Sequence, residues 1–389
     1  MTKQPSYRFA GYTEVWEEKK LSDGISKIGD GIHGTPVYSE DGDYYFINGN
    51  NLVDGKIFLF PETKKVQSNQ LTVSDTSLKK NTILMSINGT IGSLAWYRDE
   101  KIMLGKSVAY LTTEEFDRKF IYSILQTPNI VKHFNNNLTG TTIKNLGLKT
   151  IRDTVISLPS LPEQTAIGSF FQDIDQLISL QQRKLEVLKE QKKTYLKLLF
   201  PAKGQTKPAL RFAGFEDDWK EVKLGEVTDR YDNLRVPISA NERVSGDTPY
   251  YGANGIQDYV DGYTHDGEFI LIAEDGASDL KDYPVQYVNG KVWVNNHAHV
   301  IQGKKDLINN IFLLFAVKQI NIEPFLVGGG RAKLNSDIMM KLPLHLPTLP
   351  EQEAIGSFFQ DLDKAIAKQE EKVNQLKESK QTLLRKMFI

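Results

Sequence analysis

The sequence contains no cysteine among its 389 residues, which excludes disulfides and thiolate metal sites. No run approaches the roughly 20 apolar residues that a membrane-spanning helix needs. The N-terminal stretch is polar and charged, without the apolar segment of a secretory signal. We therefore expect a soluble, cytoplasmic protein without a membrane partner.

An excess of charge of one sign is also missing, because 48 basic residues stand against 49 acidic ones. This balance excludes a nonspecific polycation. It still permits local basic faces, since residues 101–150 hold seven basic and three acidic side chains, whereas residues 251–300 hold two and eight.

Recognisable catalytic signatures are absent as well, including the nucleophile elbow, the kinase motifs and the zinc-protease motif. The stretch Gly29 to Gly34 matches G-x-G-x-x-G, but a proline follows where the helix of a dinucleotide site should begin. The stretch Gly105 to Ser107 resembles the end of a P-loop, but Glu100 replaces the first glycine of that motif. We therefore expect no catalytic residue in this chain.

One histidine pair raises the question of a metal. His297 and His299 would share one face of a strand, so a metal site is conceivable. No third ligand is evident from the spacing. The preferred interpretation is that both are polar strand residues bonded to neighbouring loops, and no metal is expected.

A 43-residue segment is present twice in the chain. Leu158–Phe200 and Leu346–Phe388 align without a gap and share 25 identities in 43 positions. A second, shorter repeat is RFAGYTEVWEEKKL, from Arg8, which is similar to RFAGFEDDWKEVKL, from Arg211. Each half therefore runs from a head motif through a long body to a tail motif.

The bodies of the two halves differ in length and in amino-acid sequence, but both contain strand-like segments followed by a helix-like segment. This layout predicts an α+β fold with two domains of mixed strands and helices, each followed by a long helix. The predicted boundaries are a first domain at 1–157, a first helix at 158–200, a linker at 201–210, a second domain at 211–345 and a second helix at 346–389.

Both tails are typical of long, capped helices. Ser160 to Glu163 and Thr348 to Glu351 each form a capping box with proline in the first turn. Apolar residues recur in a heptad pattern along each tail and would form an apolar seam on one side of the helix. Such a seam could belong to an amphipathic helix on its own domain. Polar residues interrupt both seams at matching positions, however, which favours pairing of the two helices as a coiled coil. The breaks are Gln181 with Gln369 and Lys192 with Lys380. The apolar residues expected to pair the helices are Phe171, Ile174, Ile178, Leu185, Leu188, Phe359, Leu362, Ile366, Val373 and Leu376.

These residues resemble the specificity (S) subunit of type I restriction–modification systems over nearly the full length of the chain. The resemblance rests on the doubled phrase LPxLPEQxAIGSFFQDxD at Leu158–Asp175 and Leu346–Asp363, the RFAG openings at Arg8 and Arg211, and DGIHGTP at Asp30–Pro36. It implies two target-recognition domains that each read one half of a split, asymmetric DNA site. It also implies that the two helices pair antiparallel as a spacer with pseudo-twofold symmetry.

The same resemblance places catalysis and cofactors in partner subunits. Two modification subunits would methylate adenine with S-adenosylmethionine, and restriction subunits would use ATP and Mg²⁺ to translocate and cleave DNA. Neither an N-P-P-[FY] methyltransferase motif nor a Walker A motif occurs in this sequence, in agreement with a noncatalytic chain. One departure is that the second domain lacks the DGxHGTP phrase and has SGDTPYYGANGIQDY, from Ser245 to Tyr259.

Contacts to double-stranded DNA are expected on loops that carry amide, hydroxyl and basic side chains, because these groups read base edges and phosphates. Each such residue could instead be an ordinary turn or surface residue. In the first domain the candidates are Asp30, His33, Thr35, Asn88, Thr90, Lys106, Ser107, Thr141, Thr142 and Lys144. In the second domain they are Asn254, Gln257, Asn295, Asn296, His297, Arg331, Lys333 and Asn335.

Two other functions stay open from the residues alone. A coiled-coil scaffold could carry tandem domains that bind protein or carbohydrate, and a self-sufficient nuclease or methyltransferase is a third, less supported alternative. Neither the bases that are read nor the length of the spacer follows from the sequence.

Overall fold

The computed structural model describes residues 4–80, 82–329 and 332–389. The chain divides into two compact units, of which unit 1 comprises Met1–Arg183 with Glu370–Ile389 and unit 2 comprises Lys184–Gln369. Both long tail helices contribute residues to both units. Within the described ranges, no helix combines the length and the apolar character needed to cross a membrane.

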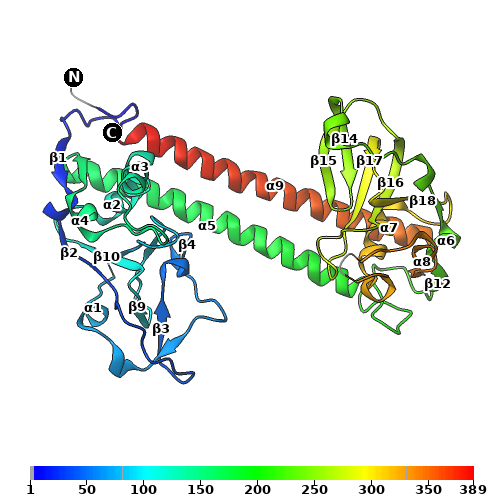
Figure 1. Cartoon of the computed structure of the whole chain (residues 1–389), viewed down its shortest axis with the longest axis horizontal. Coiled ribbons are helices and arrows are strands. Elements are labelled where there is room, and N and C mark those ends of the chain that lie inside the picture. Colours follow the sequence, from blue (N-terminus) through cyan, green and yellow to red (C-terminus); the bar gives the residue numbers. More distant parts are fainter. Residues whose placement is uncertain (1–3, 81, 330–331) are drawn as a thin grey trace. The chain divides into compact units, whose positions relative to one another are not determined.

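Unit 1 is built around a four-stranded antiparallel sheet in the order β2-β10-β7-β8 and a three-stranded sheet in the order β6-β3-β9 (Figure 1). The pairs β1–β11 and β4–β5 complete it. The strands are β1 (Glu17–Lys20), β2 (Ile25–Asp30), β3 (Tyr44–Ile47), β4 (Leu52–Val53), β5 (Lys56–Ile57), β6 (Lys65–Val66), β7 (Thr82–Ser86), β8 (Leu94–Trp96), β9 (Ile102–Leu104), β10 (Val108–Thr113) and β11 (Val155–Leu158). The helices of the body are α1 (Val73–Thr76), α2 (Arg118–Ile124), α3 (Pro128–Asn136) and α4 (Leu148–Asp153).

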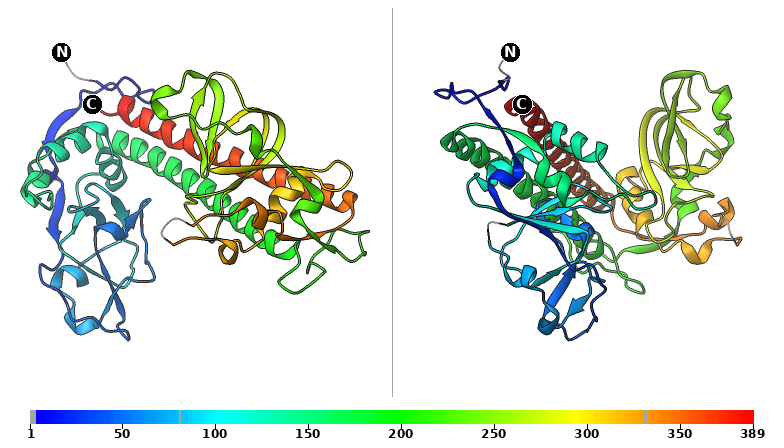
Figure 2. Two further views of the ribbon diagram at one scale, coloured as in Figure 1. Left: turned by 45° about the vertical axis from the view of Figure 1, so that its right-hand side comes forward. Right: turned by 60° about the vertical axis from the view of Figure 1, so that its left-hand side comes forward.

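Unit 2 is built around a six-stranded sheet in the order β13-β18-β16-β17-β14-β15, in which only the β14–β17 pair is parallel (Figure 2). A separate pair joins β12 to β19. The strands are β12 (Lys220–Lys223), β13 (Thr228–Arg230), β14 (Ser245–Gly252), β15 (Gly255–Val260), β16 (His265–Ala273), β17 (Val285–Val294), β18 (Ala298–Gly303) and β19 (Pro343–Leu346). The helices of the body are α6 (Leu224–Val227), α7 (Asn310–Lys318) and α8 (Ser336–Met339).

The apolar runs of the sequence explain the centres of both units. β7 reads TILMS and is buried at all five positions, as expected for a strand that is covered on both faces. α7 is apolar on nearly every side and packs against β16 and β17. In the apolar run KIFLF, at residues 56–60, only Lys56–Ile57 forms a strand, and Phe58 and Leu59 beyond it lie 51% and 42% exposed.

The head and tail motifs of each half bind one another. In unit 1 the Arg8 guanidinium donates from Nε and Nη2 to the two carboxylate oxygens of Glu163, both at 2.7 Å. In unit 2 Arg211 makes the same bidentate pair with Glu351, at 2.8 and 2.6 Å. The capping-box pattern assigns these glutamates to the helix N-terminus, but both carboxylates are engaged by an arginine far away in the sequence.

The glutamine that follows each of these glutamates joins the tail helix to the body of its unit. The Gln164 side chain accepts from the backbone N–H of Asp117, the N-cap of α2, and donates to the Pro159 carbonyl. Gln352 makes the equivalent bonds with Asn309, the N-cap of α7, and with a proline carbonyl. The shared LPEQ segment therefore attaches each tail helix to a helix in the body of its unit. Gly168 is part of it, because an added Cβ would come within 2.5 Å of the backbone nitrogen of Phe120.

An aromatic cluster closes each unit around the end of a tail helix. In unit 1 the ring of Phe388 lies 5.2 Å from Phe120, 5.6 Å from Phe171 and 6.4 Å from Trp16. In unit 2 the corresponding ring is Phe200, which contacts the rings of Trp219, Phe312 and Phe359 at 5.6 to 6.2 Å. The last residue of each repeated segment is thus a core residue of its unit.

The tail helices are α5 (Leu161–Leu198) and α9 (Leu349–Met387), and they run antiparallel within each unit. All ten residues expected on the seam are buried or half-buried. The lysines that interrupt the seams are paired across the helices. Lys380 contacts Asp175 at 2.5 Å in unit 1, and Lys192 contacts Asp363 at 2.5 Å in unit 2.

Candidate nucleic-acid interface

The four candidate loops of unit 1 gather at one edge of its sheet. Because β2 is antiparallel to β10 and β10 to β7, the end of β2, the start of β10 and the end of β7 share that edge. The loop at 30–35 joins the loop at 105–107 through the bridge between Ile32 and Gly105. The loop at 86–92 joins the loop at 139–145 through the bridge between Asn88 and Asn145.

Close backbone contacts hold these loops together. The N–H groups of Ile32 and Ile87 donate to the carbonyls of Leu104 and Ser107, at 2.8 and 2.9 Å. Glycine is required at Gly31, because an added Cβ would lie 2.0 Å from the Leu104 carbonyl oxygen. The DGIHG phrase is therefore explained by the seating of this loop against the end of β9.

A fifth segment of this cluster, at Asn48 and Gly49, was not predicted from the sequence. The Ser107 hydroxyl donates to Asn48 Oδ1 at 3.0 Å and accepts from the Gly49 N–H at 2.9 Å. The Thr90 hydroxyl donates to the Gly49 carbonyl at 3.1 Å. Two candidate reading residues, Ser107 and Thr90, thus hold the loops in place. The only local signal for the missed segment was an Asn- and Gly-rich turn after a strand.

The outer surface of the cluster carries the side chains that a ligand can reach. Asp30 and His33 form a pair at 2.9 Å, in which the histidine side chain is 75% exposed. Asn88 is half-buried, and its Oδ1 atom is buried without a hydrogen-bond partner among the described residues. The exposed candidates are His33, Thr35, Thr90, Lys106, Thr141, Thr142 and Lys144.

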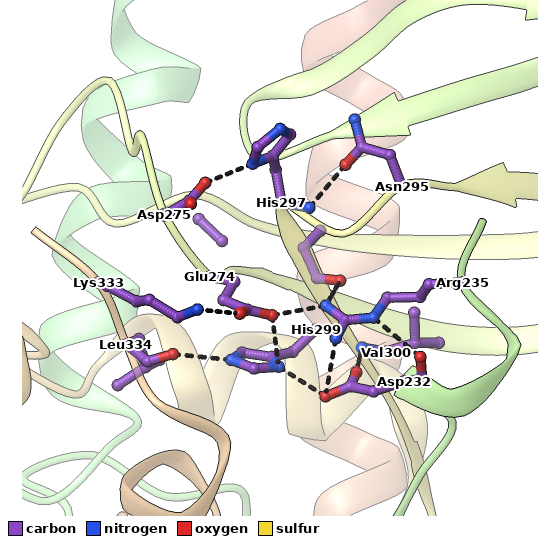
Figure 3. Close-up of polar contacts among 12 residues, drawn as sticks. Asp232, Arg235, Glu274, Asp275, Asn295, His297, His299, Val300, Lys333 and Leu334 are labelled. Atoms are coloured by element: carbon purple, nitrogen blue, oxygen red, sulfur yellow. Dashed lines mark hydrogen bonds and ion pairs between the residues drawn. The ribbon is translucent and has the colours of Figure 1, made fainter. Parts of the chain in front are cut away.

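The candidate loops of unit 2 also meet one another (Figure 3). Asn295 is buried; its side-chain amide donates to the side-chain oxygen Oε1 of Gln257 at 3.4 Å and accepts from the backbone N–H of His297 at 2.8 Å. His297 Nδ1 lies 2.5 Å from a carboxylate oxygen of Asp275, and Asp275 forms a backbone bridge with Lys333. The loops at 251–257, 274–278 and 295–299, together with residues 327–329 and 332–335, therefore form a second cluster.

The exposed candidates of the second cluster are mainly amides. Asn254, Gln257 and Asn296 are exposed, whereas His297, Lys333 and Asn335 are half-buried. The Asn254 amide also ties the cluster together, donating to the Gly276 carbonyl at 2.9 Å. Arg331 lies outside the described residues.

A network of charged groups supports the second cluster from beneath, and the sequence did not reveal it (Figure 3). The two oxygens of Glu274 contact Arg235 Nη1 at 2.6 Å and Lys333 Nζ at 2.7 Å. His299 is buried; its Nδ1 lies 2.7 Å from Asp232 and its Nε2 lies 2.8 Å from the Leu334 carbonyl. Lys333, a candidate phosphate contact, is thus ion-paired within the protein.

Burial and hydrogen bonding act in opposite directions on the two acids of this network. Burial raises the pKa of Asp232, but the hydrogen bond and charge of His299, the Val300 N–H and the charge of Arg235 together outweigh it and leave the pKa below its usual value. Burial likewise raises the pKa of Glu274, and the bonds from Lys333 and Arg235 bring the pKa below its usual value. Both carboxylates are therefore anionic at neutral pH.

The donor atoms of Asp232, Glu274 and His299 lie within 4.8 Å of one another, a spacing that could hold a metal ion. Here the negative charge is already compensated, because Arg235 and Lys333 contact Glu274 directly. A metal would have to displace these cations. The arrangement fits an internal ion network, and both histidines of the sequence pair are bonded to carboxylates from neighbouring loops.

Comparisons with known proteins agree on one family. The family model described as the type I restriction modification DNA specificity domain matches residues 13–190 and 216–378. A putative type I restriction enzyme specificity subunit from Haemophilus influenzae is 49% identical over 142 residues, which cover 36% of this chain and 36% of that protein. The putative type I restriction enzyme MjaX specificity subunit from Methanocaldococcus jannaschii is 24% identical over 95% of this chain and 92% of that protein. The crystal structure of the type I restriction–modification S subunit from M. genitalium shares the fold, with a TM-score of 0.67 and 18% identity over 100% of this chain and 99% of that one.

Proposed function

Because the chain belongs to the family of type I restriction modification DNA specificity domains, we propose that it is the noncatalytic subunit that reads DNA sequence in a type I restriction–modification complex. The DNA site is bipartite and asymmetric, with one loop cluster for each half-site. One observation carries this proposal: two loop clusters rest on the same head-and-tail framework but present different side chains. A shared framework keeps the mode of binding, while different side chains change the bases that are read.

The chemistry of the two clusters supports different half-sites. The first cluster presents hydroxyls and lysines, which suit adaptable base contacts and phosphates. The second presents the amides of Asn254, Gln257 and Asn296, and Asn and Gln side chains can bond adenine through its N6 and N7 atoms. Neither cluster needs to perform chemistry on the base.

Methylation and cleavage are assigned to partner subunits. Two modification subunits supply S-adenosylmethionine-dependent methylation of adenine, and restriction subunits supply ATP- and Mg²⁺-dependent translocation and cleavage. This assignment is supported by the absence of N-P-P-[FY] and Walker A motifs from the sequence. The chain binds no cofactor of its own in this scheme.

A domain replacement tests the division of labour. Residues 22–157 are exchanged for the corresponding segment of another family member, and the methylated sequence is determined in cells that carry the modification subunits. Only one half of the methylated sequence should change, because the second loop cluster is untouched. A change in both halves would refute the division.

The spacer role of α5 and α9 needs a separate experiment. Deleting matched turns from both helices should shorten the gap between the half-sites, and an unchanged gap would show that the helices do not set it.

A binding assay on random duplexes, with and without the modification subunits, separates the reading of DNA sequence from a scaffold function. A scaffold that binds protein or carbohydrate would show no sequence preference in either state.

A further inference from the structure

Unit 1 contains a cleft of about 670 Å³ that the loop cluster does not account for. The lining comes from the β4–β5 hairpin, the edge strand β8, α2, and the parts of α5 and α9 that belong to unit 1. The hairpin reaches the helix directly. Lys56 Nζ donates to Ser179 Oγ at 2.9 Å, and Gln182 Nε2 donates to an Asp54 carboxylate oxygen at 3.2 Å.

The lining of the cleft is rich in cations. Its acidic residues are Asp54 and Asp175, and its basic residues are Lys56, Arg98, Lys119, Lys377 and Lys380. Both acids are engaged inside the protein, since Asp175 pairs with Lys380 and Asp54 accepts from a glutamine. A neighbouring hollow of about 300 Å³ shares Arg98 with the cleft and adds Lys80 and Arg118.

Three of these cations are not neutralised by the protein. Among the described residues, Arg98, Lys119 and Lys377 have no carboxylate within ion-pair distance. Arg98 and Lys377 are exposed, and the half-buried Lys119 donates to the Ser169 hydroxyl at 3.3 Å. Like charges facing one cleft repel one another, so an anionic ligand is favoured there.

One wall of the cleft is continuous with the candidate reading surface. Gly92 and Ser93 line the cleft, and Gly92 is the last residue of the loop at 86–92 that carries Asn88 and Thr90. A duplex held by that loop would therefore bring its backbone to the same edge. An acidic protein segment would explain the charge but not this continuity.

We propose that the cleft binds the phosphate backbone of DNA next to the half-site read by unit 1. This inference rests on the proposed function and adds a contact that is independent of sequence. Arg98, Lys119 and Lys377 neutralise phosphates and release bound counterions, while the glutamines of the lining serve as adaptable donors.

The test compares two triple variants of the full chain, assembled with its modification subunits. The cleft variant carries Arg98→Gln, Lys119→Gln and Lys377→Gln. The matched control carries Lys27→Gln, Lys132→Gln and Lys149→Gln, three exposed lysines of unit 1 that do not line the cleft. Fluorescence anisotropy measures binding to a duplex that contains the methylated sequence, at a series of salt concentrations.

The slope of log K against log salt should become shallower by about 2.7 for the cleft variant, because each phosphate that is no longer neutralised reduces the slope by about 0.9. The control should keep the wild-type slope, and the methylated sequence should be the same for both. The single variant Lys377→Gln, on the surface of α9, should reduce the slope by about 0.9. It provides a second test in case the triple variant does not fold.

The proposal would be overturned if the triple cleft variant and the single variant Lys377→Gln both kept the wild-type slope. Loss of the modification subunits from the cleft variant, with an unchanged slope for the chain alone, would also overturn it and would assign the cleft to an acidic protein segment. The slope on a random duplex separates this proposal from the proposed function. If the wild-type chain showed no sequence preference but the slopes still differed, the proposed function would fail and the cleft would remain a phosphate site.

Discussion

Replacing Glu163 with glutamine should destabilise unit 1 by about 3 to 5 kcal/mol, because it breaks a buried ion pair from one side. The Glu163 side chain is 0% exposed, and both of its oxygens accept from Arg8, whose side chain is 11% exposed. Glutamine keeps the shape but not the charge, which leaves the arginine charge buried and uncompensated. Arg8 Nη1 is already buried without a partner among the described residues, so the guanidinium has few alternatives.

Urea unfolding measures the total loss, and amide hydrogen exchange resolves which unit loses protection. Exchange should increase in α2 and β11 of unit 1, while the body of unit 2 keeps its protection. Glu351→Gln should produce the mirror result, because the Glu351 side chain is only 2% exposed. Asp153→Asn is the control, since its pair with Lys20 is about half exposed and its loss should not be measurable. A loss of less than about 1 kcal/mol in the free energy of unfolding for Glu163→Gln would refute a stabilising role for the buried ion pair of Arg8 with Glu163.

Three further outcomes are expected. Phe388→Ala should cost about 3 to 5 kcal/mol in unit 1 and Phe200→Ala a similar amount in unit 2, by urea unfolding; a cost below about 1 kcal/mol would contradict their core positions. Lys380→Ala should destabilise unit 1 by about 1 to 3 kcal/mol in urea unfolding, because it removes the ion-pair partner of Asp175, and the loss should shrink when Asp175 is also replaced by an apolar residue. Because the pKa values of Asp232 and Glu274 lie below their usual values, their contribution to stability is present above about pH 4 and is lost as the pH falls through the folded values. Hydrogen exchange of unit 2 between about pH 7 and 3, corrected for intrinsic rates, should show that loss, and constant protection would argue against it.

The tail helices could be predicted well because their information is local. Ser160 and the proline that follows it mark the start of α5, which begins at Leu161. The heptad of apolar residues is periodic, and it identified side chains that are buried or half-buried in the structure. The partners of the polar breaks could not be read in this way. Lys192 and Lys380 looked like interruptions, because each aspartate partner lies on the other helix.

The role of Glu163 could not be predicted either, because its partner is even more distant in the sequence. A capping box is a pattern of four residues, whereas the arginine that engages this glutamate lies 155 positions away. The repeated RFAG opening was visible, but nothing local connects it to the LPEQ phrase. The antiparallel pairing of β1 with β11 brings the two motifs together.

The loop clusters were partly predictable. Gly-flanked polar loops identified most segments that meet in each unit, because glycine and asparagine mark turns. Asn48 and Glu274 were missed because they stand directly after strands, at ordinary positions of the sequence. Their roles come from side-chain bonds across 59 residues in the first cluster and 39 in the second.

We expect this chain to determine which split DNA sequence its complex recognises. Methylation-sensitive long-read sequencing of host DNA, with and without this chain, tests it most directly. We predict one methylated motif that is made of two different half-sites with a fixed gap and that disappears when the chain is removed. A methylation pattern that is unchanged by removal of the chain would contradict it.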